Sequence, residues 1–205
     1  MHHTAPIHAG ENVFTIGLQD LLVLGNLFLE GVWDTTRLVA VTGSEVANRT
    51  HLRTKAGANM GELLASSGVN DGARVISGNV LTGSTKTNEQ FLGTWENQVT
   101  TLEEGNYYEM FGWILPQKGR PSLSKTFPSF EGVKYTVDTN THGEKRAFVM
   151  TGQYEQVLPM DIYPQHLMKA ILANDFERME GLGIYELIEE DVAICEYVCL
   201  SLIHI

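Results

Sequence analysis

Cysteine is scarce in this sequence, which holds only Cys195 and Cys199 among its 205 residues. Two cysteines in a cytosolic chain do not make a disulfide framework. A structural zinc ion needs four ligands and a four-iron cluster needs four cysteines, whereas only His204 adds a ligand nearby. We therefore expect two small buried side chains at Cys195 and Cys199, with a metal site that includes His204 as the alternative.

Basic residues and long apolar runs are also few. Lys and Arg number 14 against 25 Asp and Glu, which gives a net charge of -11. This balance argues against a nucleic-acid binder, because phosphate contacts need a basic surface. The longest apolar candidate, residues 18–29, is interrupted by polar side chains and falls short of the ~18 apolar residues of a membrane span. The start, MHHTAPIHAGE, has no signal-peptide pattern. We expect a soluble cytoplasmic protein without a membrane span.

Residues 35–95 carry the pattern of a small α+β domain. Strands are predicted at 37–43, 50–54 and 74–81, with a short helix at 60–66 between the second and the third. Asn59 and Glu62 form a capping-box pattern at the start of that helix. The order strand, strand, helix, strand favours a β-grasp-like unit.

The flanking segments predict further elements. Before this unit we expect a strand at 13–16 and a helix at 18–30. After it we expect two strands within 97–114, joined by a turn at 103–106, and then a loop at 117–131. Three helices are predicted to follow, at 164–174, 175–182 and 189–199. The chain therefore reads as an α+β protein that ends in a helical segment.

Three groups of residues suggest sites of chemistry. Residues 78–85 have the glycine spacing of a phosphate loop, but Ser84 replaces the required lysine, so a strand and turn explain them better. His2, His3 and His8 have no cysteine or paired carboxylate nearby and are interpreted as surface residues. The stretch 141–146 (THGEKR) could bind an anion or hold a proton-transfer group. The alternative, which composition favours, is a solvated turn with weak local ion pairs.

Several motifs together resemble the A subunit of the sodium-translocating NADH:quinone reductase. They are HHTAP at 2–6, VISGNVLTG at 75–83, MFGWILP at 110–116, NTHGEKRAF at 140–148, GQYEQVLPMDI at 152–162 and EDVAICEYVC at 190–199. The match runs in order through residues 2–199. After Cys199 it ends, and LSLIHI at 200–205 looks like a translated sequencing adapter, which we expect to be no part of the fold.

The resemblance implies an architecture and its boundaries. Residues 1–34 would be the end of a Rossmann-like domain, 35–95 a β-grasp (SLBB-like) domain, 96–158 a β-rich extension, and 159–199 a helical segment. Cys195 and Cys199 would be a remnant of an iron–sulfur scaffold. Because residues 1–34 would be part of a larger domain, we expect exposed apolar helix surface and poor solubility of the chain by itself.

The resemblance also implies a function. The chain would be part of a peripheral subunit on the cytoplasmic face of the bacterial inner membrane. It would have no flavin or iron–sulfur cluster of its own, while the whole complex uses NADH and ubiquinone and exports Na⁺. The implied partners are the other subunits of that complex. His142, Glu144 and Arg146 would be quinone-proximal or interface groups, and Phe111 and Trp113 apolar contacts, although Trp113 also fits a core position.

Two other functions remain alternatives. One is a standalone β-grasp module that binds a small ligand or a protein. The other, a related Rnf electron-transfer subunit, is disfavoured because the sequence lacks cysteine clusters.

Overall fold

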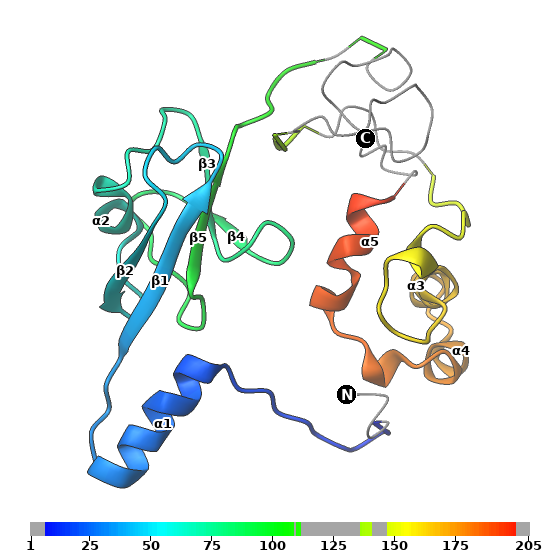
Figure 1. Ribbon diagram of the computed structural model, residues 1–205. Coiled ribbons are helices and arrows are strands. Elements are labelled where there is room, and N and C mark those ends of the chain that lie inside the picture. Colours follow the sequence, from blue (N-terminus) through cyan, green and yellow to red (C-terminus); the bar gives the residue numbers. More distant parts are fainter. Residues whose placement is uncertain (1–6, 109, 112–135, 141–146, 200–205) are drawn as a thin grey trace. The chain divides into compact units, whose positions relative to one another are not determined.

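A computed structural model describes residues 7–108, 110–111, 136–140 and 147–199. The chain forms two compact units (Figure 1). One unit comprises Phe14–Asn106 and Thr136–Asn140, and the other comprises the remaining residues. Each unit has its own core, so each is considered separately.

The first unit is built on a five-stranded mixed sheet. Its strands are β1 (Thr36–Gly43), β2 (Thr50–Lys55), β3 (Arg74–Ser77), β4 (Ser84–Lys86) and β5 (Gln98–Leu102). Their order in space is β2-β1-β5-β3-β4. β1 and β5 are parallel, with Val41 opposite Val99, whereas every other neighbouring pair is antiparallel. The predicted α+β class is confirmed for the described residues, because they form both a mixed β-sheet and several α-helices.

One face of this sheet is covered by the helix α2 (Met60–Ala65). Its buried residues Met60, Leu63 and Leu64 pack with valines of the strands, namely Val39, Val41, Val75 and Val99. The helix starts where the sequence predicts, because the Asn59 side chain accepts a hydrogen bond from the Glu62 N–H at 3.3 Å.

The helix α1 (Leu18–Glu30) also belongs to the first unit and contacts β1 through polar groups. The Gln19 side-chain amide makes two hydrogen bonds with Leu38, accepting from its N–H at 2.9 Å and donating to its carbonyl at 3.0 Å. Asp20 forms an ion pair with Arg37. No residue of α1 is fully buried, and the helix ends at Gly31, which adopts the left-handed conformation.

The described part of the second unit is helical. It contains α3 (Pro164–Leu172), α4 (Phe176–Gly181), α5 (Ala193–Tyr197) and three short 3₁₀ turns at Tyr154–Gln156, Ile184–Glu186 and Glu189–Val192. Tyr154, Leu158, Cys195 and Cys199 form its core. The buried Gln165 ties α3 to the preceding segment, because its side-chain oxygen accepts from the N–H groups of Thr151 and Gly152 at 2.9 and 3.1 Å.

Three predictions of local structure are wrong. Residues 13–16 form no strand. The strand predicted at 74–81 ends at Ser77, because Gly78 has φ +100° and starts a turn. The described residues 107–108 and 110–111 form no strand after β5, so the predicted hairpin around 103–106 is absent there. The loop expected at 117–131 lies outside the described residues.

The described helices can also be compared with the requirements of a membrane span. None of the helices in the described ranges has the length and the apolar character that crossing a membrane requires.

Candidate functional site

The structure describes one of the five residues that the resemblance marks as site residues. Phe111 is 53 % exposed and has φ 60°, a left-handed backbone conformation that is uncommon for an aromatic residue. His142, Glu144, Arg146 and Trp113 lie outside the described residues. The site is therefore considered through the described residues that flank them.

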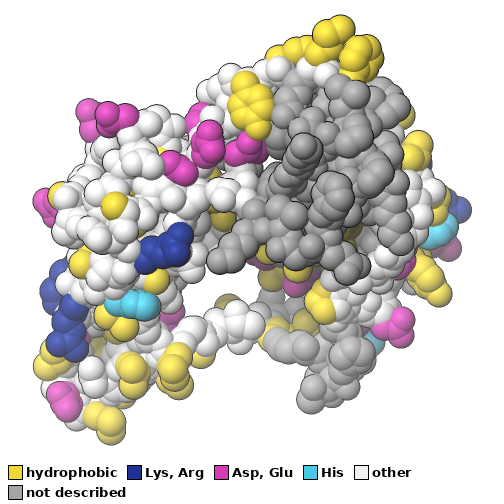
Figure 2. Space-filling view, turned by 45° about the horizontal axis from the view of Figure 1, so that its top comes forward, with side chains coloured by type: hydrophobic (Ala, Val, Ile, Leu, Met, Phe, Trp, Pro, Cys, Tyr) yellow, Lys and Arg dark blue, Asp and Glu magenta, His cyan; other side chains and the backbone are white. Residues whose placement is uncertain are grey.

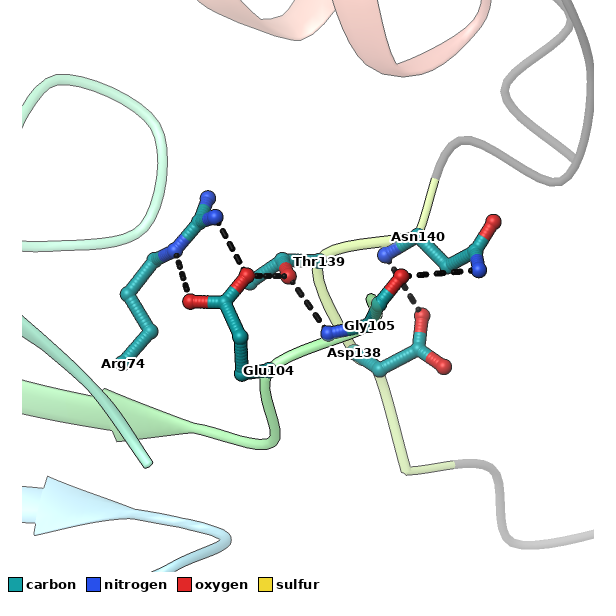
Figure 3. A network of polar contacts seen from close by, with 6 residues as sticks. All are labelled: Arg74, Glu104, Gly105, Asp138, Thr139 and Asn140. Atoms are coloured by element: carbon teal, nitrogen blue, oxygen red, sulfur yellow. Dashed lines mark hydrogen bonds and ion pairs between the residues drawn. The ribbon is translucent and has the colours of Figure 1, made fainter. Parts of the chain in front are cut away.

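Immediately before residue 141, a polar network anchors the chain to the end of β5 (Figure 3). We call it the clasp, and it comprises Arg74, Glu104, Gly105, Asp138, Thr139 and Asn140. Its centre is the ion pair between Arg74 and Glu104, in which the Arg74 Nε donates to Glu104 Oε2 at 2.9 Å and a second guanidinium nitrogen donates to Oε1. Such paired hydrogen bonds give the strongest and most directional contacts of arginine with a carboxylate.

The clasp continues through Thr139 to the backbone of Gly105. The Thr139 hydroxyl donates to Glu104 Oε1 and accepts from the Gly105 N–H, both at 2.8 Å. The Asn140 side chain donates to the Gly105 carbonyl at 2.9 Å. A Cβ on Gly105 would lie 2.3 Å from the Asn140 nitrogen, so this close approach requires glycine. The clasp therefore fixes the position from which residues 141–146 begin.

The arginine also favours the charged form of Glu104. Hydrogen bonding from Arg74 lowers the pKa of Glu104, and the Thr139 hydroxyl adds to the effect, although partial burial opposes it. Glu104 therefore stays ionised at lower pH than an ordinary glutamate.

A second feature, which follows β5 in the sequence, is a short segment rich in aromatic residues. Its described side chains, Tyr107, Tyr108, Met110 and Phe111, are all exposed. This places apolar surface directly beside the clasp in sequence, which is compatible with a contact to an apolar ligand or a partner.

The two cysteines lie in the core of the second unit. Both thiols are buried, and the Tyr154 hydroxyl donates to the Cys199 sulfur at 2.7 Å. Burial raises the pKa of Cys195 to about 11, and burial together with the Cys199 contact raises the pKa of Tyr154. Both groups are protonated at neutral pH, so they serve as packing groups there. The expectation of two small buried side chains is confirmed.

The metal-site alternative gains no ligands from the structure. In the described part of the chain, no three His, Cys, Asp or Glu side chains gather to hold a metal ion. His204, as well as His2 and His3, lies outside the described residues.

The loop at 78–83 is a turn that satisfies its own backbone. The Asn79 side-chain oxygen accepts from the N–H groups of Leu81 and Thr82 at 2.8 and 3.0 Å, and the Asn79 carbonyl accepts from Gly83. A phosphate loop needs these N–H groups to point at a ligand. The interpretation of residues 78–85 as a strand and turn is therefore supported over a phosphate loop.

Sequence reasoning missed the clasp. Arg74 and Glu104 are 30 residues apart, and Glu104 and Thr139 are 35 apart. No local pattern marks such a pair. The one available signal was Gly105, which was interpreted as a turn residue although its role is the close approach of Asn140.

Comparison with known proteins identifies the sheet domain. Residues 38–88, which contain most of β1 and all of β2, α2, β3 and β4, match the family model described as the NQRA C-terminal domain (NQRA_SLBB). The first unit thus contains an SLBB domain.

The relatives extend this match over nearly the whole chain. The sequence is 42 % identical over 202 residues to the A subunit of the Na(+)-translocating NADH-quinone reductase of Shewanella frigidimarina, and the match covers 97 % of this chain and 46 % of that protein. The corresponding proteins of Vibrio atlanticus and Neisseria meningitidis are 39 % and 37 % identical, each with 45 % of its length covered. The chain is therefore homologous to the A subunit of this reductase, and it spans about half the length of the relatives it matches. The resemblance inferred from the motifs is confirmed.

Proposed function

We propose that the chain acts as part of a peripheral subunit of a sodium-pumping NADH:ubiquinone oxidoreductase, at the cytoplasmic face of the bacterial inner membrane. In this role it supports ubiquinone reduction coupled to Na⁺ export. The observation that carries the proposal is the 42 % identity to the A subunit of such a reductase over 97 % of the chain. A similarity of this extent covers both units, so it involves more than the sheet domain.

The redox centres of such a complex belong, in this proposal, to other subunits. NADH and ubiquinone are substrates of the whole complex, and this chain binds no flavin or iron–sulfur cluster. The number of cysteines supports this division of roles, because a four-iron cluster usually needs four cysteines and the sequence has two.

The finer fold assignment is also a proposal. The sheet order and the parallel pair β1–β5, with α2 packed on one face, support a β-grasp topology. Its strand β5 (Gln98–Leu102) lies just after residue 95, where we propose the boundary of the β-grasp domain. We propose that residues 1–34 are the end of a Rossmann-like domain, 96–158 a β-rich extension and 159–199 the helical segment, with 200–205 a sequencing-adapter scar outside the fold.

The proposed quinone-proximal or interface residues are His142, Glu144 and Arg146, together with Phe111 and Trp113. The clasp supports this assignment, because it holds Asn140 next to Gly105 and so fixes the start of the segment that contains the three polar residues. The exposed side chain of Phe111 is compatible with an apolar contact.

A hybrid complex tests the proposal. The chain replaces the matched part of the A subunit in the Shewanella frigidimarina reductase, and Na⁺-stimulated ubiquinone reduction is measured on the purified complex. We expect an assembled and active hybrid, in which Arg146→Ala lowers the quinone reduction rate or prevents assembly. The matched control Lys86→Ala, a change of charge in another part of the chain, leaves both intact.

Two results would count against it. If Arg146→Ala leaves quinone reduction and assembly untouched, the residue assignment is wrong. If a folded hybrid subunit fails to join the complex, the standalone β-grasp binding module becomes the better hypothesis.

A further inference from the structure

The strand β2 forms one edge of the sheet, and its outer side has no partner within the described residues. The strand order places β2 at one end and β4 at the other (Figure 1). β4 has only three residues, whereas β2 has six residues, which pair with β1 without a bulge. An edge strand offers unpaired N–H and C=O groups, which proteins usually protect by a short strand, a proline, a bulge or charged side chains. Of these devices β2 has only the charged side chains.

The backbone of β2 presents hydrogen-bonding groups at this edge. In an antiparallel pair, residues alternate between those bonded to the partner strand and those that point away from it. Ala40 of β1 lies opposite His51 and donates its N–H to the Asn97 carbonyl at 2.9 Å, on the side away from β2. His51, and by the same alternation Arg53, therefore direct their N–H and C=O groups outward. No described residue bonds to these groups.

The side chains of β2 divide into two faces. His51, Arg53 and Lys55 are exposed, whereas Leu52 is half-buried and packs against the core under α2. Lys55 forms an ion pair with Asp34 at 3.3 Å, but the Arg53 guanidinium pairs with no described residue. A strand added at this edge would continue both faces, because side chains directly opposite each other in a sheet share a face.

The exposed face of β2 is basic in an otherwise acidic chain. The net charge is -11, yet β2 carries Arg53 and Lys55, with His51 on the same face. Figure 2 shows Lys, Arg and His side chains gathered on the left of the view, the side on which Figure 1 shows the sheet. Complementary charge selects partners and speeds their encounter, so this face fits an acidic partner.

A second copy of the chain fits this edge poorly. In an antiparallel pairing centred on Arg53, this arginine lies opposite its own counterpart, and His51 lies opposite Lys55. Like charges directly opposite each other destabilise a sheet. Anionic lipids and nucleic acids match the charge, but their phosphates cannot pair with alternating N–H and C=O groups. An extended polypeptide supplies both kinds of partner.

We propose that β2 is a docking edge for an extended, acidic segment of another polypeptide, which adds to the sheet as a strand. The backbone of this segment bonds to the outward groups of His51 and Arg53. Acidic side chains at every second position lie opposite His51, Arg53 and Lys55, and apolar side chains between them extend the core past Leu52. This role of β2 goes beyond the proposed function and rests on the geometry and charge of the strand alone.

A peptide in which glutamate and valine alternate serves as the probe. Its binding to the immobilised chain is measured by surface plasmon resonance at low and at moderate salt concentration. We expect saturable binding that weakens with salt, because exposed charges are screened. The same peptide with N-methyl groups on its glutamate amides, which would donate to β2 in an antiparallel pairing, keeps its charges but loses these donors. It should bind at least about tenfold more weakly.

Variants at Arg53 separate charge from strand pairing. Arg53→Glu should weaken binding at least about tenfold, and a peptide with lysine in place of its central glutamate should recover most of the loss. Lys86→Glu on β4 makes the same charge change at the other edge and should leave binding unchanged. Arg53→Pro removes an outward N–H without touching the bonds to β1, so circular dichroism should be unchanged while neither peptide binds.

Hydrogen exchange resolved to single amides tests the geometry of the added strand. Saturation with the glutamate–valine peptide should slow exchange at the outward amides of His51 and Arg53 at least about tenfold. The amides of Leu52 and Thr54 already bond to β1 and should change little.

Four outcomes would overturn the proposal. No saturable binding of the peptide means that the charges of β2 only protect an edge from association. Equal binding of the N-methylated peptide means that charge alone acts, as it would with lipid or nucleic-acid phosphates. Unchanged exchange at His51 and Arg53 places the peptide elsewhere on the chain. Self-association of the chain that Arg53→Pro abolishes means that a second copy is the partner.

Discussion

At the scale of single residues, Glu104 shows how one side chain connects distant parts of the sequence. Its two oxygens accept hydrogen bonds from Arg74 on β3 and from Thr139, which lies 35 residues further along the chain. Both side chains of the ion pair are partly shielded from water, so the pair is screened less than an exposed one. Glu104 therefore links the sheet to the chain segment at 136–140.

Replacing Glu104 by glutamine is expected to lower the free energy of unfolding at pH 7 by about 1–2 kcal/mol, because a charge-assisted contact is lost. The pKa of Glu104 is lowered in the folded state, so its contribution is complete above the unfolded value. It is lost as the pH falls through the lowered pKa. Urea unfolding of both proteins at pH 7 and near pH 3 measures this, and the difference should shrink at the lower pH.

A control for this prediction is Lys55→Gln, which breaks an exposed ion pair with Asp34. It should change the stability little, because exposed pairs contribute little. A Glu104→Gln protein as stable as the wild type at pH 7 would show that the clasp does not stabilise the first unit.

The thiols lead to a second prediction at this scale. Cys195 is 1 % exposed and its pKa is raised to about 11, so at pH 8 it is a protonated, inaccessible thiol. We expect iodoacetamide to modify Cys195 and Cys199 slowly in the folded protein and rapidly in urea. A cysteine placed at the exposed Thr94 should react quickly in both conditions, and rapid reaction of Cys195 in the folded state would contradict its burial.

At the scale of elements, a residue at the end of a helix can contribute to the stability of the whole helix. The helix α2 is a short one, and short helices depend on their caps and on tertiary packing. Asn59 supplies the cap, while Met60, Leu63 and Leu64 supply the packing.

Asn59→Ala is expected to lower the free energy of unfolding by about 1 kcal/mol, because the Glu62 N–H loses its acceptor. Asn59→Asp keeps an oxygen in the same place and should retain most of the stability. Denaturant unfolding of the three proteins distinguishes the cap from a general effect of the position, since equal losses in both variants would point to the latter.

The sequence predicts elements whose determinants are close together. The helix expected at 18–30 has the observed bounds of α1, since its apolar spacing and the terminal Gly31 are local features. The short, polar β4 was not predicted, because Ser84, Thr85 and Lys86 form a strand through pairing with β3. The strand expected at 13–16 fails for the converse reason: three of its four residues are apolar, but no strand among the described residues pairs with them.

The candidate site was less predictable than the fold. The clasp depends on contacts between residues 30 or more positions apart, and such contacts leave no periodic pattern. The resemblance to the reductase family supplied His142, Glu144 and Arg146, which stay proposals.

At the scale of the whole molecule, the chain combines a high negative charge with a concentrated apolar surface. The net charge of -11 favours solubility, whereas the exposed apolar side chains of α1 favour association. These side chains are Leu18, Leu21, Leu22, Phe28 and Leu29. The balance between them decides how the chain behaves by itself.

We expect the double variant Leu22→Glu and Phe28→Glu to be more soluble than the wild-type chain, because it replaces two exposed apolar side chains of α1 with charged ones. Precipitation by polyethylene glycol measures the difference. The double variant Asn48→Glu and Thr94→Glu adds the same charge at exposed polar positions, so it should bring a smaller gain. Equal gains would assign the effect to charge alone.

The close approach of Gly105 and Asn140 indicates where the sequence can accept insertions and deletions. The backbone leaves the first unit after Asn106 and returns at Thr136, and the clasp holds nearby residues of the two segments together, with Gly105 bonded to Thr139 and Asn140. Closing a loop costs only about 0.6 kcal/mol more for each doubling of its length, so additions between such ends affect the sheet little. The clasp thus marks a graft site, where a homologue can gain or lose residues, or an engineer can insert a reporter domain, without disturbing the sheet of the first unit.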